Sequence, residues 1–108
     1  MRDKLKDGIL FAYYGKLLNE HQYEILQLYY DCDMSLAEIS EIFGTTRQGV
    51  REIIIRSISK LEEYEKKLCL VLKLKKISNE LERIINNIEN KDSIRKQLEL
   101  LLSEFKEI

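Results

Sequence analysis

The sequence predicts an all-α protein, and three observations carry this prediction. Proline is absent from the 108 residues and glycine occurs only four times, so little interrupts a helix. Apolar residues recur at intervals of three and four along most of the chain, which is the period of a helix with one buried face. Two segments begin with serine or asparagine followed three residues later by glutamate or glutamine, a pattern typical of helix starts.

The chain has the length of one domain with a modest core. We expect a three-helix unit with a helix-turn-helix over residues 1–64. A long helix leads from this unit into a C-terminal antiparallel helical hairpin over residues 65–108. We expect this extension to pack on the same domain or to dimerise.

The first two helices are expected over residues 2–18 and 20–30. In the first helix, Leu5, Ile9, Ala12 or Tyr13, and Leu17 share one predicted apolar face. Asn19 and Gln22 form a capping box that starts the second helix. Its apolar face is expected to comprise Tyr23, Leu26, Gln27 and Tyr30, widened by Ile25, Leu28 and Tyr29. We interpret the aromatic residues as core or interface rather than as stacking platforms for RNA bases, because they lie at helical spacing among Leu and Ile.

The helix-turn-helix is predicted between Ser35 and Lys60. Ser35 and Glu38 form a capping box, and Gly44 is suited to the left-handed conformation that ends a helix. Thr45 and Thr46 then supply a hydroxyl that caps the next helix. The expected inward residues are Leu36, Ile39, Ile42 and Phe43 on the first helix and Val50, Ile53, Ile54 and Ile58 on the second.

The outward residues of the second motif helix are of the types that read nucleic acid. Arginine is suited to guanine, glutamine to adenine, and threonine hydroxyls with a helix N-terminus to phosphate. The alternative is that these residues form only the solvated face of an amphipathic helix. Between Thr46 and Lys60 the basic residues outnumber the single Glu52, leaving a local charge of +3. The predicted nucleic-acid-binding residues are Thr45, Thr46, Arg47, Gln48, Arg51, Glu52 and Arg56.

Beyond Lys60 the apolar stripe continues and changes phase, which indicates a bend or break near Tyr64–Leu68. One stripe comprises Leu70, Leu74, Ile77, Leu81, Ile84 and Ile88, and the other comprises Ile94, Leu98, Leu101, Phe105 and Ile108. A turn with a helix cap is expected at Asn90–Ser93. Each stripe is longer than a lone hairpin needs, so we expect a homodimer through these helices, with packing inside one chain as the alternative.

Several classes of function are disfavoured. The net charge of −1 requires any nucleic-acid interface to be a local patch. Cys32, Cys69 and the single His21 suggest no disulfide, metal site, cofactor or catalytic group, so we do not expect an enzyme. The N-terminal residues lack the apolar segment of a secretion signal, and no apolar run is long enough to insert in a membrane. We expect a cytoplasmic protein.

The stretch from Leu17 to Leu68 resembles the YlxM-like family of small bacterial helix-turn-helix proteins, and the resemblance covers nearly the whole chain in length and helix order. It is carried by LYYDCDMSLAEI and by Thr46-Arg47-Gln48-Gly49-Val50. The motif is also similar to region four of the housekeeping sigma factors, of the winged-helix-like DNA-binding class, which contacts the promoter −35 element. Gly49 stands where the family commonly has Ala, which loosens the helix by about 1 kcal/mol. Arg51 stands where Tyr is common, which makes the face more basic.

The resemblance implies a regulatory role in the signal recognition particle (SRP) pathway, because family members are encoded beside the SRP GTPase and its receptor. On this basis the sequence predicts a nucleic-acid-binding regulator, with DNA as the first partner and RNA as the second. The alternative is an adaptor that does not bind DNA and contacts the SRP GTPase or SRP RNA through the same helical fold.

Overall fold

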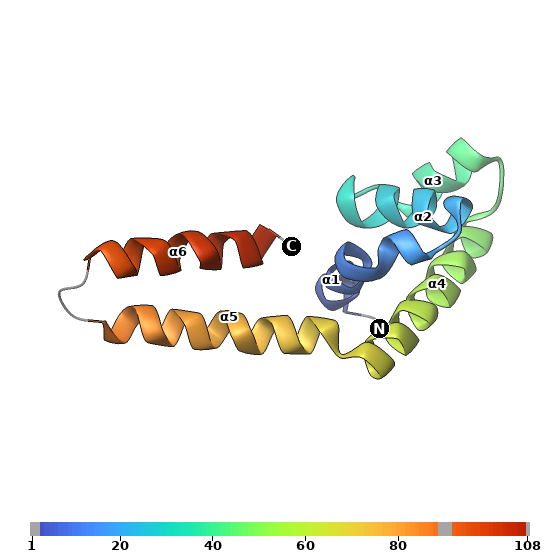
Figure 1. Ribbon diagram of the computed structural model, residues 1–108. Helices are drawn as coiled ribbons and strands as arrows, with labels where there is room; N and C mark the ends of the chain where they lie inside the picture. The colour runs from blue at the N-terminus through green and yellow to red at the C-terminus, as the bar shows by residue number, and fades with distance from the viewer. Residues whose placement is uncertain (1–2, 89–91, 108) are drawn as a thin grey trace. The chain divides into compact units, whose positions relative to one another are not determined.

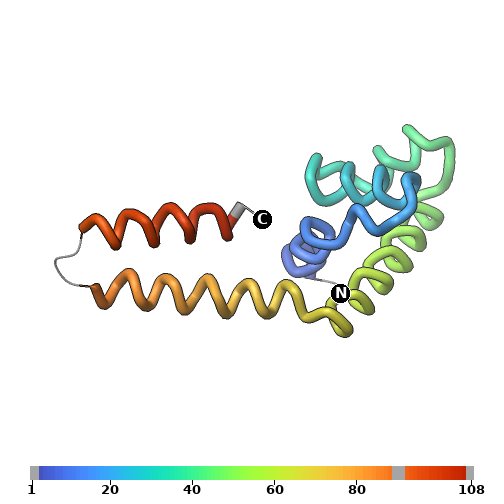
Figure 2. Tube along the Cα trace, viewed as in Figure 1, coloured from blue at the N-terminus to red at the C-terminus, as the bar shows by residue number. Residues whose placement is uncertain are grey.

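The computed structural model describes residues 3–88 and 92–107, and its chain trace is shown in Figures 1 and 2. The described residues are almost entirely helical and contain no strand, which confirms the all-α prediction. They divide into two compact units, Met1–Leu68 and Cys69–Ile108. The elements are α1 Lys4–Tyr14, a 3-10 turn Gly15–Leu17, α2 Glu20–Leu26, a π-helical turn Gln27–Asp31, α3 Leu36–Phe43, α4 Arg47–Leu68, α5 Leu70–Asn87 and α6 Asp92–Glu107.

The core of the first unit is built on one face of α4. Val50, Ile54, Ser57, Ile58 and Leu61 recur at helical spacing on this face and are all buried. Helices α1, α2 and α3 all pack against α4 (Figure 1). The predicted inward residues Val50, Ile54 and Ile58 are thereby confirmed, whereas Ile53 is only half-buried.

Helix α1 buries a different face from the one predicted. Leu5, Ile9, Ala12 and Leu17 are exposed, and the buried residues are instead Asp7, Leu10, Phe11 and Tyr14, followed by Leu18. The helix carries two apolar stripes, and the one with aromatic rings removes more apolar area from water. Its rings also find aromatic partners, since the Phe11 ring centroid lies 5.2 Å from that of Tyr23. These contacts select the aromatic face for the core.

Both helices of the N-terminal pair end earlier than predicted. Helix α1 stops at Tyr14 and continues as a 3-10 turn, where a Cβ on Gly15 would lie 2.8 Å from the Phe11 ring. Helix α2 starts at the predicted capping box, in which the Gln22 backbone N–H donates to Asn19 Oδ1 over 2.8 Å. It ends at Leu26, and residues 27–31 form the wider π-helical turn instead of an α-helix to Tyr30. A π turn changes the direction of the side chains that follow it.

Helix α3 starts and stops as the sequence indicates. The Glu38 N–H donates to Ser35 Oγ and the Ser35 N–H donates to Glu38 Oε1, each over 3.1 Å. The hydrogen bond from the Ser35 backbone lowers the pKa of the Glu38 carboxyl. Gly44 lies in the left-handed region with φ 64° and ψ 35°, and its N–H donates to the Ser40 carbonyl. Ile39 is fully buried, but the prediction for Ile42 was wrong because its side chain points outward and is 57% exposed.

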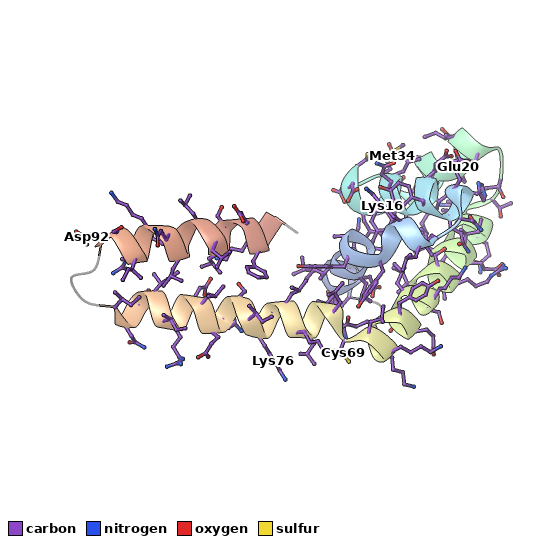
Figure 3. All side chains as sticks on the ribbon, in the orientation of Figure 1. Lys16, Glu20, Met34, Cys69, Lys76 and Asp92 are labelled. Carbon is purple, nitrogen blue, oxygen red and sulfur yellow. The ribbon has the colours of Figure 1, made fainter. Side chains whose placement is uncertain are left out.

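The second unit is a helical hairpin formed by α5 and α6. The two helices run antiparallel, with side chains of both between them (Figures 1 and 3). Cys69 interrupts the helix before α5 with φ 52°, one residue beyond the stretch where a break was expected. Lys106 Nζ pairs with Glu82 Oε1 at 2.7 Å across the hairpin.

The seam of the hairpin contains only part of the predicted stripes. The predicted residues that are half-buried are Leu74, Leu81, Ile88, Leu98 and Phe105. Ile85 and Leu102 are buried, whereas Ile84 and Leu101, which precede them, are exposed together with Leu70, Ile77 and Ile94. The expected turn at Asn90 and Lys91 lies outside the described residues, as does Ile108, and Asp92 begins α6. None of the helices in the described part of the chain is both long and apolar enough to span a bilayer.

The conformation of Gly44 predicts a specific tolerance to substitution. Apart from its two chain neighbours, no described residue has an atom within 4 Å of a Cβ built on Gly44, so any cost comes from its positive φ alone. We expect Gly44→Val to lower the free energy of unfolding by about 1–2 kcal/mol, because a β-branched residue is strained in the left-handed region. Gly44→Asn should cost clearly less, since asparagine visits that region readily. Urea unfolding of both variants measures this difference, and equal losses would contradict it.

Candidate nucleic-acid interface

The candidate interface lies on the turn before α4 and on the first turns of that helix. The Gly49 N–H donates to Thr46 Oγ1 over 2.9 Å, and the Val50 N–H donates to the Thr46 carbonyl over 3.0 Å. Thr46 therefore caps α4, as its position after Gly44 predicted. Helix geometry leaves the backbone N–H groups of Arg47 and Gln48 without partners inside the helix. Together with the positive end of the helix dipole, these groups favour an anion at this end of α4.

All of the predicted nucleic-acid-binding residues are exposed, on the turn before α4 and on its first three turns. Gln48, Glu52 and Arg56 lie on the side of α4 opposite its buried face, and Arg51 lies on its flank. Arg47, seven residues before Ile54, lies on the side of the buried face but is exposed at the start of the helix. We call the set the α4 surface; it comprises Thr45, Thr46, Arg47, Gln48, Arg51, Glu52 and Arg56.

The charges of the α4 surface are not all equally available. Arg56 Nη2 lies 3.7 Å from Glu52 Oε2, in the i,i+4 arrangement of a solvated ion pair. Such exposed pairs are weak and are exchanged readily for a stronger partner. Arg47 and Arg51 have no ion pair with any described residue. These two guanidinium groups are therefore the basic groups most ready to meet a phosphate or a base edge.

Gly49 has a packing role that the sequence did not reveal. A Cβ at this position would lie 3.0 Å from Thr45 Oγ1 and 3.2 Å from Thr46 Oγ1. The glycine therefore leaves room for both hydroxyls beside the first turn of α4, and Thr46 needs this position to cap the helix. The low helix propensity of glycine is thus offset by a contact that an alanine would disturb. The sequence signal was the pair of threonines three and four residues earlier.

Sequence reasoning also missed a set of residues behind Arg51. Lys4 Nζ pairs with Asp33 Oδ1 at 2.9 Å and lies 4.2 Å from the centre of the Tyr29 ring. The hydrogen bond from Lys4 lowers the pKa of the Asp33 carboxyl, and Asp33 itself has a positive φ of 54°. These contacts join residues far apart in the chain, so no local pattern could indicate them.

No metal centre accompanies the α4 surface within residues 3–88 and 92–107. No group of three or more His, Cys, Asp or Glu side chains in this part of the chain could hold an ion. Neither Cys32 nor Cys69 forms a disulfide within the described part of the chain, and Cys32 is exposed while Cys69 is half-buried. The chemistry that this surface offers is therefore hydrogen bonding and charge, supplied by side chains and by the start of a helix.

Comparison with known proteins identifies the family. Residues 1–104 match the family described as "Putative helix-turn-helix protein, YlxM / p13 like". This chain belongs to that family. The capped α3, the left-handed Gly44 and the capped start of α4 are the structural form of the motif in its description. The resemblance seen in the sequence is confirmed.

Relatives cover most of the chain. The UPF0122 protein of Clostridium novyi (strain NT) is 41% identical over 105 residues, which span 92% of this chain and 91% of that protein. A UPF0122 protein of Clostridium perfringens (strain ATCC 13124) is 39% identical over 108 residues, or 96% of each chain. One from Thermoanaerobacter sp. (strain X514) is 44% identical over 81 residues, or 75% of this chain and 69% of that protein.

The packing of Gly49 predicts an unusual response to alanine. Gly8 is a matched control inside α1, where a Cβ would make an ordinary contact 3.6 Å from the Tyr30 ring. We expect Gly8→Ala to raise the free energy of unfolding by about 0.5–1 kcal/mol through helix propensity. Gly49→Ala should raise the free energy of unfolding by less than this, or lower it, because Thr45 and Thr46 must shift. Chemical denaturation of both variants tests this, and an equal gain would show that the threonine contacts are without effect.

Proposed function

We propose that this protein is a helix-turn-helix regulator that binds nucleic acid, with DNA as its first target and RNA as its second. The observation that carries the proposal is the exposure of Arg47, Gln48 and Arg51 at a capped helix start, with neither arginine in an ion pair with another described residue. A helix presented in this way fits the major groove of B-DNA, with residues near its N-terminus reaching base edges.

Each residue of the α4 surface has a role in this proposal. Thr45, Thr46 and the first backbone N–H groups of α4 hold a phosphate and set the orientation of the helix. Arg47 and Gln48 reach base edges, where arginine suits guanine and glutamine suits adenine. Arg51 contacts a base or a phosphate one turn further along. Glu52 restrains Arg56 in the free protein and releases it to the backbone of the duplex.

Substitutions on the α4 surface test this role. We expect the Arg47→Ala/Arg51→Ala variant to melt at nearly the wild-type temperature, because both side chains are exposed. It should bind a selected duplex at least tenfold more weakly, since a base-contacting arginine contributes about 1–3 kcal/mol. Selection from random DNA at physiological salt, followed by binding isotherms, measures the effect. Arg95→Ala on α6 is the matched control, because it removes an exposed cation outside the motif.

The salt dependence separates the roles of the arginines. Loss of a phosphate contact should weaken all sequences alike and reduce the salt slope by about one, whereas loss of a base contact should relax preference at one base pair. If the wild-type chain enriches no DNA sequence, the regulator proposal fails for DNA, and the α4 surface is then a face for RNA or for protein.

A second function is favoured by the uncovered apolar residues and by the net charge of −1. In this alternative the protein is an adaptor of the SRP pathway that contacts the SRP GTPase or SRP RNA without binding DNA. Alanine at Arg47 and Arg51 would then leave binding to a protein partner intact, and loss of the helices after Tyr64 would abolish it. Neither function needs a cofactor or a catalytic group, and both belong to the cytoplasm, where the thiols of Cys32 and Cys69 stay reduced.

A row of exposed apolar residues on one side of the hairpin supports a homodimer, and we call this row the apolar flank. Ile77 and Ile84 on α5 are seven residues apart, as are Ile94 and Leu101 on α6, and all four are exposed. A repeat of seven keeps a stripe on one side of a helix that packs against another helix. On both helices the flank directly precedes the buried seam, as Ile84 precedes Ile85 and Leu101 precedes Leu102. In an antiparallel pair this common offset places both flanks on the same side of the hairpin.

We therefore propose that two copies join these flanks into a four-helix arrangement. The wild-type chain should be a dimer at micromolar concentration in sedimentation equilibrium. Leu101→Lys should shift it to monomer without unfolding it, because the side chain is already 42% exposed. The matched control is Leu5→Lys on α1, an equally apolar and more exposed position, which should leave the dimer intact. A wild-type chain that stays monomeric at all concentrations would overturn this proposal.

A further inference from the structure

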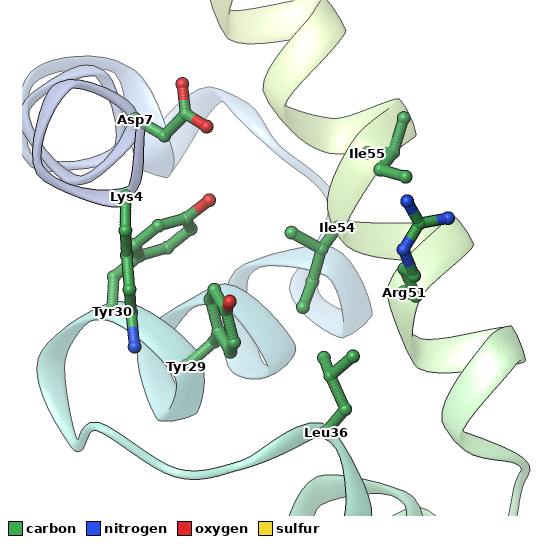
Figure 4. Close-up of a pocket in the computed structure, with 8 residues that line it drawn as sticks. All are labelled: Lys4, Asp7, Tyr29, Tyr30, Leu36, Arg51, Ile54 and Ile55. Atoms are coloured by element: carbon green, nitrogen blue, oxygen red, sulfur yellow. The ribbon is translucent and has the colours of Figure 1, made fainter. Parts of the chain in front are cut away.

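A cavity of about 250 Å³ lies in the first unit behind the α4 surface (Figure 4). It is bordered by α1, the π-helical turn, the start of α3 and the first half of α4. Leu36, Ile54 and Ile55 give it an apolar side, and Leu36 and Ile54 point toward the space beside Tyr29. Tyr29 and Tyr30 supply an aromatic wall. Cavities with an apolar lining and a few polar groups are where small ligands bind.

The aromatic wall is held in place before any ligand arrives. The π-helical turn sets the Tyr29 and Tyr30 rings edge to face, with centroids 5.0 Å apart and planes at 85°. Lys4 lies over one face of Tyr29 and also pairs with the exposed Asp33 carboxylate. π turns recur at functional sites, and a rigid wall lowers the entropy lost on binding.

Among the charged groups around the cavity, Arg51 is the one that can pair with an anion. Lys4 and Asp7 line its α1 side, with Asp7 buried, and Arg51 lines its α4 side. Lys4 is already paired with Asp33, whereas Arg51 has no ion pair within the described residues. A guanidinium binds a planar carboxylate through two parallel hydrogen bonds. The cavity is smaller than the roughly 300–1,000 Å³ that drug-sized ligands occupy, so it has room for about one ring.

We propose that this cavity binds a small aromatic carboxylate. The ring lies between Tyr29 and the apolar side formed by Leu36 and Ile54, and the carboxylate pairs with Arg51. Because Arg51 also belongs to the α4 surface, the ligand withdraws one arginine from nucleic acid. This competition with nucleic acid rests on the proposed function, whereas the ligand site itself does not.

Benzoate is the probe for the site, and benzamide, which has the same ring without the charge, is its control. Titration of the isotopically labelled full-length chain, followed by amide NMR shifts, should show saturable changes at Tyr29, Leu36 and Ile55. Benzamide should bind about tenfold more weakly, as should benzoate to Arg51→Gln, because each change removes a charged hydrogen-bonded pair. Arg47→Gln removes the same charge one turn away from the cavity and should leave benzoate binding unchanged.

Three outcomes would contradict the proposal of a ligand site. These are shifts that do not saturate, equal binding of benzamide, and equal weakening by Arg47→Gln and Arg51→Gln. The competition is tested separately with a selected duplex, whose binding should weaken at saturating benzoate in the wild type and not in Arg51→Gln. The NMR titration uses the protein alone. It therefore tests the ligand site independently of nucleic-acid binding, even if no duplex binds.

Discussion

Burial of one face of α4 is the constraint on which the first unit depends. Val50, Ile54, Ile58 and Leu61 are each 5% exposed or less, and α1, α2 and α3 all pack against this helix. Fully burying one such side chain contributes about 1.5–3 kcal/mol, so rotating α4 about its axis would cost several of these contributions at once. The same helix carries the candidate interface. The core therefore determines which side chains of α4 face outward and holds them in a fixed orientation.

The start of α4 is determined just as strictly, by a turn of three residues. Gly44 ends α3 in a left-handed conformation, and Thr46 caps α4 through the Gly49 N–H. Gly49 in turn leaves space for the threonine hydroxyls. A short turn with both ends capped gives the two helices little freedom, which suits a surface that must present its groups in one register. Arg51 then links this surface to the cavity behind it, because one side chain borders both.

Much of the fold and of the candidate interface was accessible from local patterns. The capping boxes at Asn19 and Ser35, the role of Gly44 and the exposed residues of α4 all depend on groups within a few positions of one another. The tertiary contacts were not accessible in this way. Helix α1 has two apolar stripes of similar periodicity, and only the neighbouring rings of Tyr23 and Tyr30 decide that Phe11 points inward. In the hairpin, the partner helix decides that Ile85 rather than Ile84 forms the seam.

The sequence by itself determined the helical class, the helix-turn-helix with its caps, and the family, because these follow from hydrogen bonds and periodicities that span only a few residues. Only the tertiary structure decided which stripe of α1 is buried, where the π-helical turn places Tyr29 and Tyr30, and that Arg51 borders a cavity. The physical reason is that a helical period shows which residues share a face but not which face meets a partner. That choice depends on the area and shape of side chains contributed by distant parts of the chain.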